Sequence, residues 1–148
     1  MKTNPTEPGV PPVRNRLGYL LKHARERLSA LSSEALQPLG ISGRQLAVMT
    51  ALLEGEPPSQ LEAAQRLAID RTTMVALLDE LEAKGLVERR ADAGDRRRNI
   101  VALTDLGRRT LVEGTRATDQ AERIFLASLS SADADQFRRM LQAVVGGD

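Results

Sequence analysis

Residues 70–104 read DRTTMVALLDELEAKGLVERRADAGDRRRNIVALT, and the spacing of their apolar side chains changes partway along. The first part shows the i, i+3, i+4, i+7 spacing of one helix face: Met74, Leu77, Leu78 and Leu81. Asp70 is a suitable cap for the start of this helix, and Gly85 is typical of the residue after its end. Two short runs with β-branched residues, 86–90 and 99–103, then flank a polar loop that contains a glycine. The stretch therefore predicts a helix followed by an antiparallel hairpin.

Two more helices are predicted upstream, because Ser42 and Ser59 each begin a capping box. In this motif the serine side chain accepts a bond from a free backbone N–H, and a Gln or Glu three residues later reaches back. The second box opens a helix over 59–67, which a tight turn joins to the helix over 70–84. Short helices in this order are typical of a helix-turn-helix, whose second helix enters the major groove of DNA. The alternative is an ordinary helical hairpin with a solvated polar face.

The hairpin favours DNA binding, because its loop is basic. Segment 84–98 has a formal charge of +3, whereas the whole chain has +1. Arginines on a narrow loop can reach into a minor groove or pair with flanking phosphates. We predict DNA contacts from the recognition helix (Arg71, Thr72, Thr73 and Ala76) and from the wing (Asp95, Arg96, Arg97 and Arg98). We predict contacts to the DNA backbone from five more residues: Ser42, Arg44, Ser59, Gln60 and Arg90.

The predicted helices at both ends of the chain carry apolar faces. The helix-turn-helix and hairpin between them have little apolar surface left to cover these faces. A helix over 13–37 has the apolar spacing of a coiled-coil seam: Leu17, Leu21, Ala24, Leu28, Leu31 and Ala35. Thr104 can cap a further helix from Asp105, whose seam is built mostly of small residues: Thr110, Gly114, Ala117, Ala121, Ile124 and Ser128. A last helix begins at Ser130 or Ser131 and presents one apolar face: Phe137, Met140, Leu141 and Val144. We expect a homodimer that buries these faces, the alternative being that they pack within one chain.

The expected fold class is mainly α with a small β-hairpin wing, that is, a winged helix-turn-helix with N- and C-terminal dimerisation helices. Residues 1–12 are polar, hold four prolines and predict a flexible tail. We expect an N-terminal dimerisation helix over 13–40, a DNA-binding domain over 41–107 and C-terminal dimerisation helices over 108–148. A two-fold dimer predicts a pseudo-palindromic operator, with half-sites about 10 bp apart or a multiple of that spacing.

The composition argues against catalysis and against most sensing chemistry. The chain has no cysteine, which excludes disulfides, thiolate nucleophiles and cysteine-type zinc sites. His23 is the only histidine, and carboxylate pairs such as Asp79/Glu80 lie on a helix surface. We therefore expect no enzymatic activity, no metal and no cofactor. No apolar run approaches ~18 residues, and the N-terminus lacks the apolar region of a signal peptide, so we expect a cytoplasmic protein without a membrane span.

Two segments carry a family resemblance. Residues 70–89 resemble the recognition helix and first wing strand of MarR-type transcription regulators. Residues 95–107 are similar to that family's wing, with its Asp-x-Arg motif and its Leu-Thr-x-x-Gly exit. The likeness extends over roughly 14–145, and its specific part is 59–107. It implies a dimeric winged helix-turn-helix that binds double-stranded DNA.

The resemblance also implies roles for the wing residues. Asp95 would orient Arg97 through a charge-assisted bond, and Arg97 would enter the minor groove. Family members often carry a Ser or Thr and then an Arg where this chain has Val75 and Ala76. Sequence reading would therefore rest more on groove shape and on the start of the recognition helix.

MarR-type regulators often bind small aromatic or phenolic anions between the dimer helices and the winged unit. A ligand that favours a different separation of the recognition helices weakens DNA affinity. Four residues could supply polar groups to such a pocket, or could form a solvated face beside the seam: Arg16, Tyr19, His23 and Arg27. Three hypotheses for the whole protein stay open: a repressor released by a ligand, a ligand-independent DNA-binding protein, and a winged-helix module that binds protein.

Overall fold

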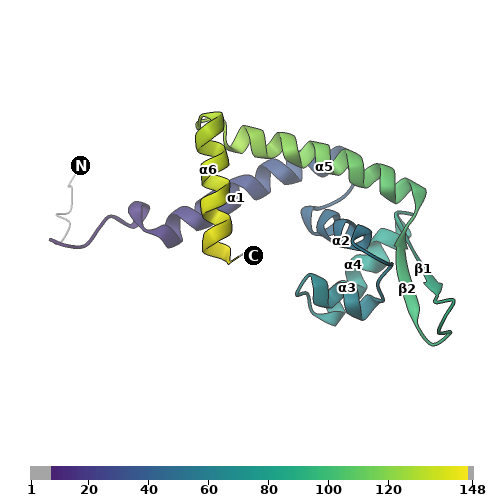
Figure 1. Cartoon of the computed structure of the whole chain (residues 1–148). Coiled ribbons are helices and arrows are strands. Elements are labelled where there is room, and N and C mark those ends of the chain that lie inside the picture. Colours follow the sequence, from purple (N-terminus) through teal and green to yellow (C-terminus); the bar gives the residue numbers. More distant parts are fainter. Residues whose placement is uncertain (1–7, 147–148) are drawn as a thin grey trace. The chain divides into compact units, whose positions relative to one another are not determined.

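The computed structural model describes residues 8–146, so residues 1–7 of the predicted tail lie outside the described residues. The elements in chain order are η1 (Val13–Asn15), α1 (Leu17–Leu36), η2 (Gln37–Leu39), α2 (Gly43–Leu53), α3 (Gln60–Arg66), α4 (Arg71–Ala83), β1 (Val87–Ala91), β2 (Asn99–Leu103), α5 (Asp105–Phe125) and α6 (Ser131–Val145) (Figure 1). The chain divides into two compact units. The central unit is residues 32–120, and the terminal unit comprises the segments before and after it.

The central unit packs short helices against the hairpin. Helix α2 contacts α3, α4 and β2, and α4 also contacts β1. The core is aliphatic, as the shortage of aromatic residues requires, and its fully buried side chains include Leu36, Val48, Met49, Met74, Leu78, Leu81, Val87 and Val101. The predicted inward face of the helix over 70–84 is confirmed, because its four apolar residues are all buried.

The hairpin is held on the N-terminus of α3. Strands β1 and β2 pair antiparallel, with Val87 opposite Leu103 and Ala91 opposite Asn99. Ser59 forms a bridge with Ile100, and the Val101 N–H donates to the carbonyl of Pro58 at 2.9 Å. These bonds continue the sheet onto the residues that cap α3, so the wing and the first helix of the helix-turn-helix are joined through the backbone.

Most of the predicted helix caps are confirmed. The box at Ser42 is complete, since the Ser42 side chain and that of Gln45 each accept from the other residue's N–H. Ser130 caps α6. The second predicted box is formed in one direction: the Ser59 hydroxyl accepts from the Glu62 N–H at 3.2 Å. The Glu62 carboxylate pairs instead with Arg98, the residue before β2, because a charged donor binds a carboxylate more strongly than a neutral N–H does.

The apolar spacing predicts that α2 turns Leu46, Met49 and Leu53 inward, and that α3 turns inward Leu61, Ala64, Leu67 and Ala68. Both predictions are partly wrong. Leu53 and Leu61 are exposed, at 49% and 56%, whereas Val48 and Ala63 are fully buried. Elements packed on several sides of α2 and α3 decide which stripe faces inward. A helix of two or three turns offers too few repeats for its own spacing to identify that stripe.

The terminal unit contains the first part of α1, the end of α5 and α6. Helix α1 begins at Leu17, later than predicted, because Val13–Asn15 form a 3-10 turn that ends at an extended Arg16. Helix α5 ends at Phe125, so Ser128 lies beyond the helix that was expected to include it. Leu17 is 76% exposed and Val144 81%, so large apolar side chains of both helical ends are uncovered in one chain. Among the described residues, no helix is long and apolar enough to cross a membrane.

Candidate nucleic-acid interface

The start of α4 is built by a capped turn. The Asp70 carboxylate accepts from the Thr73 N–H at 2.8 Å and from the Thr73 hydroxyl at 2.6 Å. The hydroxyl bond, followed by the backbone bond, lowers the pKa of Asp70 below its ordinary value. Ala68 in the preceding turn has φ 49°, a left-handed conformation that is unusual for a residue with a side chain. The turn therefore accepts some backbone strain and places the first residues of α4 at the surface.

The structure keeps three of the four predicted recognition residues exposed: Arg71, Thr72 and Ala76. Thr73 is half-buried, and its hydroxyl is committed to the cap. Its donor is therefore used within the chain, and the polar side chains that α4 offers outward at its first turn are those of Arg71 and Thr72.

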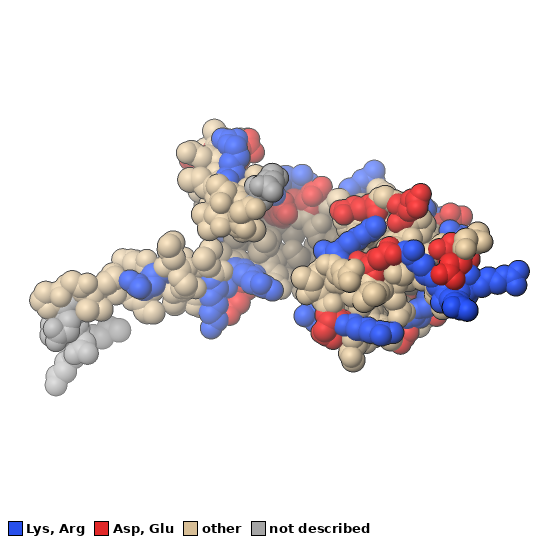
Figure 2. Space-filling view, turned by 60° about the horizontal axis from the view of Figure 1, so that its bottom comes forward, with Lys and Arg blue, Asp and Glu red and all other residues tan. Residues whose placement is uncertain are grey.

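The tip of the wing is a tight loop with exposed cations. The Asp95 carboxylate accepts from the backbone N–H of Arg97 at 3.0 Å, and the Asp95 carbonyl accepts from the Arg98 N–H at 3.0 Å. Asp95 therefore holds the loop backbone, and the bond that the structure gives it is to the Arg97 N–H rather than to the guanidinium predicted from the resemblance. Arg96 and Arg97 are exposed. Figure 2 shows basic side chains projecting where the hairpin lies, with acidic ones among them.

Two arginines of the basic segment are engaged inside the unit. The Arg98 guanidinium pairs with Glu62 of α3. Arg89 of β1 is only 20% exposed in its side chain and contacts two carboxylates of α4, those of Asp79 and Glu82. Both arginines contribute to the formal charge of +3 on segment 84–98, from which the basic wing was predicted. For Arg89, the signal in the sequence was the acidic pair Asp79 and Glu82 on the preceding helix.

The residues predicted to contact the DNA backbone have mixed surroundings. Ser42 and Ser59 serve as helix caps through their hydroxyl groups, and Gln60 accepts from Arg89. Arg44 is exposed, and Arg90 is exposed with a long contact of 3.7 Å to Glu88. Of the five predicted backbone contacts, Arg44 and Arg90 are therefore the ones whose charged groups lie at the surface.

The buried side-chain amide of Gln45 links α2 to α4. The sequence predicted only a capping role for this residue. Gln45 is 4% exposed, and its amide nitrogen donates to Glu80 at 2.7 Å. Its amide oxygen also accepts from the Lys84 ammonium at 2.9 Å, and the same ammonium donates to the Gly40 carbonyl at 2.6 Å. The end of α4 is thereby bonded to Gly40 before α2 and to Gln45 in the first turn of α2.

The residues predicted to meet a ligand do not form one row. Arg16 lies before α1 with an extended backbone, so it leaves the helical spacing assumed for it. The rings of Tyr19 and His23 are tilted by 42° with their centres 4.1 Å apart, and His23 lies 3.6 Å from a Glu26 oxygen. The Arg27 guanidinium lies over the ring of Phe125, 5.6 Å from its centre. Of the two arginines in this set, Arg27 is the one that lies over an aromatic ring.

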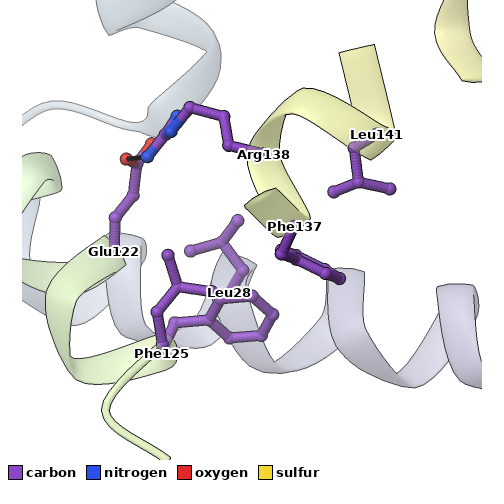
Figure 3. A pocket seen from close by; sticks show the side chains of 7 residues that line it. Leu28, Glu122, Phe125, Phe137, Arg138 and Leu141 are labelled. Carbon is purple, nitrogen blue, oxygen red and sulfur yellow. Dashed lines mark hydrogen bonds and ion pairs between the residues drawn. The ribbon is translucent and has the colours of Figure 1, made fainter. Parts of the chain in front are cut away.

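The terminal unit also contains an apolar cavity of about 100 Å³. Its lining is Leu28, Phe125, Leu126, Phe137 and Leu141, with Glu122 and Arg138 at its edge. The last two form an ion pair at 2.7 Å, and the aromatic and leucine side chains point inward below it (Figure 3). Within residues 8–146, no group of three or more His, Cys, Asp or Glu could hold a metal ion.

Comparisons with known proteins agree with this geometry. The family model described as MarR family matches residues 39–98. The HTH-type transcriptional repressor NicR of Pseudomonas putida is 27% identical over 136 residues, which are 92% of this chain and 86% of NicR. The transcriptional repressor CouR, solved on a 23-mer DNA duplex, is 31% identical with a TM-score of 0.82, covering 90% of this chain and 94% of CouR.

A second structure, CouR from Rhodococcus jostii RHA1 bound to p-coumaroyl-CoA, is 29% identical with a TM-score of 0.75, over the same shares of the two chains. These matches extend over nearly the whole chain, well beyond the helix-turn-helix. They confirm the mainly helical fold class with a hairpin wing. The chain belongs to the MarR family of transcription regulators.

Proposed function

We propose that this chain represses transcription as a homodimer that binds a pseudo-palindromic operator in double-stranded DNA. In each subunit the first turn of α4 would enter the major groove, and the wing tip would reach the neighbouring minor groove or its phosphates. The observation that carries the proposal is the joint exposure of Arg71 and Thr72 on α4 and of Arg96 and Arg97 on the loop that follows it. CouR, which shares this fold, is itself bound to a duplex.

The interface combines base readout with charge. Arg71 can bridge guanine acceptors, and Thr72 can donate to a base edge or a phosphate. Asp95 would act indirectly by holding the loop, and Arg44 and Arg90 would meet phosphates beside the site. If each dimer neutralises about 6–10 phosphates, DNA affinity falls about 10³–10⁵-fold between about 50 and 200 mM salt. The protein would act in the cytoplasm, without catalysis and without a cofactor.

The terminal helices would form the dimer, with the DNA-binding domain at 41–107 between them. The exposed leucines of α1 and valines of α6 supply the apolar surface that a second copy would cover. A small aromatic or anionic ligand would bind near α1, where Arg27 already lies over Phe125. CouR in complex with p-coumaroyl-CoA supports this ligand class. The recognition helices of the dimer would have one spacing that fits the operator and another that does not. The ligand weakens operator binding only to the extent that it binds the second state more tightly than the first.

Selection of bound sequences from random duplex DNA tests the proposal directly. We expect an inverted repeat to be enriched, and Arg97→Ala to weaken binding of the selected duplex by about 10-fold or more. Arg116→Ala is the matched control, because it removes an exposed arginine of α5, which belongs neither to α4 nor to the wing, and should leave binding unchanged. Recovery of no motif, together with no salt-sensitive retention, would instead favour a module that binds protein.

A further inference from the structure

We infer that Arg89 is a positioning residue, which sets the angle between the recognition helix and the wing and does not itself contact DNA. The inference rests on the proposed function, since it concerns how the two DNA-contacting elements are held together. Arg89 lies in the middle of β1, within the basic segment that leads to the wing tip. Its neighbour Arg90 has the same charge but the opposite orientation on the strand.

Each nitrogen of the Arg89 guanidinium donates a hydrogen bond within the central unit. Its Nη2 donates to Asp79 at 2.7 Å, and its Nη1 donates to Glu82 at 3.2 Å. Its Nε donates to the side-chain oxygen of Gln60 at 2.9 Å. The backbone N–H of Arg89 also lies 3.3 Å from a Glu82 oxygen. All three nitrogens of the planar group therefore have partners within the protein, and three of its five N–H donors are used. Because the side chain is only 20% exposed, little of the group is left open to a phosphate.

These partners come from two helices, and Arg89 joins them to a strand. Gln60 is the first residue of α3, Asp79 and Glu82 lie on the second half of α4, and Arg89 itself belongs to β1. One rigid fork thus bonds both helices of the helix-turn-helix to the base of the wing. A guanidinium does this because its donors are fixed in a plane, whereas an ammonium is a point charge on a flexible stem.

The same contacts neutralise two carboxylates on the helix that approaches DNA. Asp79 and Glu82 are 61% and 45% exposed in their side chains, so they are open to solvent apart from Arg89. Without Arg89 they would add negative charge close to the phosphates. Loss of the residue would therefore disturb both the geometry of α4 and the local potential.

A comparison of two duplexes distinguishes positioning from phosphate contact. The full chain is titrated onto the selected operator and onto a random duplex of equal length, at several salt concentrations. A phosphate contact weakens binding to both duplexes alike and reduces the salt slope by about 1 when it is removed. For Arg89→Gln we expect binding to the operator to fall about 10-fold or more, binding to the random duplex to fall less than about 3-fold, and the slope to stay unchanged.

Arg90→Gln is the matched control, because it removes the adjacent, exposed arginine of the same strand. Its losses on the two duplexes should be equal. Arg89→Lys keeps the charge but cannot form the fork, so it should still lower the ratio of operator to random binding. Adding Asp79→Asn and Glu82→Gln to Arg89→Gln should recover binding to random DNA without recovering that ratio.

The outcomes are separable. Equal losses on both duplexes with a shallower salt slope would make Arg89 a direct contact and overturn the inference, as would an unchanged ratio in both Arg89 variants. If Arg89→Gln does not fold, Arg89→Lys decides by the same ratio. Failure of the unmodified protein to bind any duplex would count against the proposed function instead.

Discussion

At the residue scale, Gly107 near the start of α5 has the least space for a side chain among the glycines that the structure describes. A Cβ there would lie 2.0 Å from the carbonyl oxygen of Leu86. That carbonyl is already fixed, since it accepts from the Thr104 N–H at 3.1 Å, and the Thr104 hydroxyl donates to Gly85 at 2.6 Å. We expect Gly107→Ala to lower the free energy of unfolding by about 3 kcal/mol, measured by urea denaturation, because backbone must move.

Gly43→Ala serves as the control for this clash. Gly43 is the first residue of α2, and a Cβ there would meet no heavy atom within 4 Å. Alanine also restricts the unfolded chain more than glycine does, so the variant should be as stable as the parent or slightly more stable. Equal unfolding free energies for Gly107→Ala and the parent would show that α5 can shift away from Leu86 without cost.

At the scale of the element, α4 depends on the charge of its cap. Bonds from Thr73 hold the pKa of Asp70 below its ordinary value in the folded protein. A carboxyl whose folded pKa is lowered stabilises the fold above its unfolded pKa, and this contribution is lost as the pH falls through the folded pKa. We expect the parent to melt at a higher temperature than Asp70→Asn near neutral pH, with the difference shrinking below about pH 4.

Asparagine is itself a good cap, so the comparison isolates the charge more than the hydrogen bond. Asp135→Asn on the exposed face of α6 should follow the parent at every pH. A melting difference between Asp70→Asn and the parent that persists unchanged into acid would mean that the Asp70 charge does not stabilise α4.

At the scale of the whole molecule, the exposed seam of α1 should control assembly. Leu17 is 76% exposed and Leu21 54%, and burying a leucine stabilises an interface by about 1.5–3 kcal/mol. We expect Leu21→Glu to shift the protein from dimer to monomer in sedimentation velocity and to weaken operator binding, because a monomer reads one half-site.

Lys22→Glu introduces the same side chain at the next residue, which is exposed and polar. It should leave the sedimentation coefficient unchanged. A Leu21→Glu protein that sediments like the parent would show that this part of the seam stays uncovered in the assembly, and the dimer would have to be held elsewhere.

The features that sequence reasoning predicted well depend on neighbours in the chain. The Ser42 box, the Asp70 cap and the Ser130 cap each join groups three residues apart, so residue type and spacing are sufficient to identify them. The face of α4 was equally clear, because 13 residues repeat the helical period often enough to define one stripe. The paired strands followed from the β-branched runs on either side of a polar loop.

Contacts between distant residues could not be read in this way. Arg89 and Arg98 looked like free cations in the basic segment, and folding brings them to carboxylates of α4 and α3. The exposed Leu53 and Leu61 looked like core residues, until the elements around α2 and α3 placed other side chains inward. Local spacing encodes hydrogen bonds within one or two turns, whereas the reach of a long side chain and the partner that it finds depend on which elements meet in three dimensions.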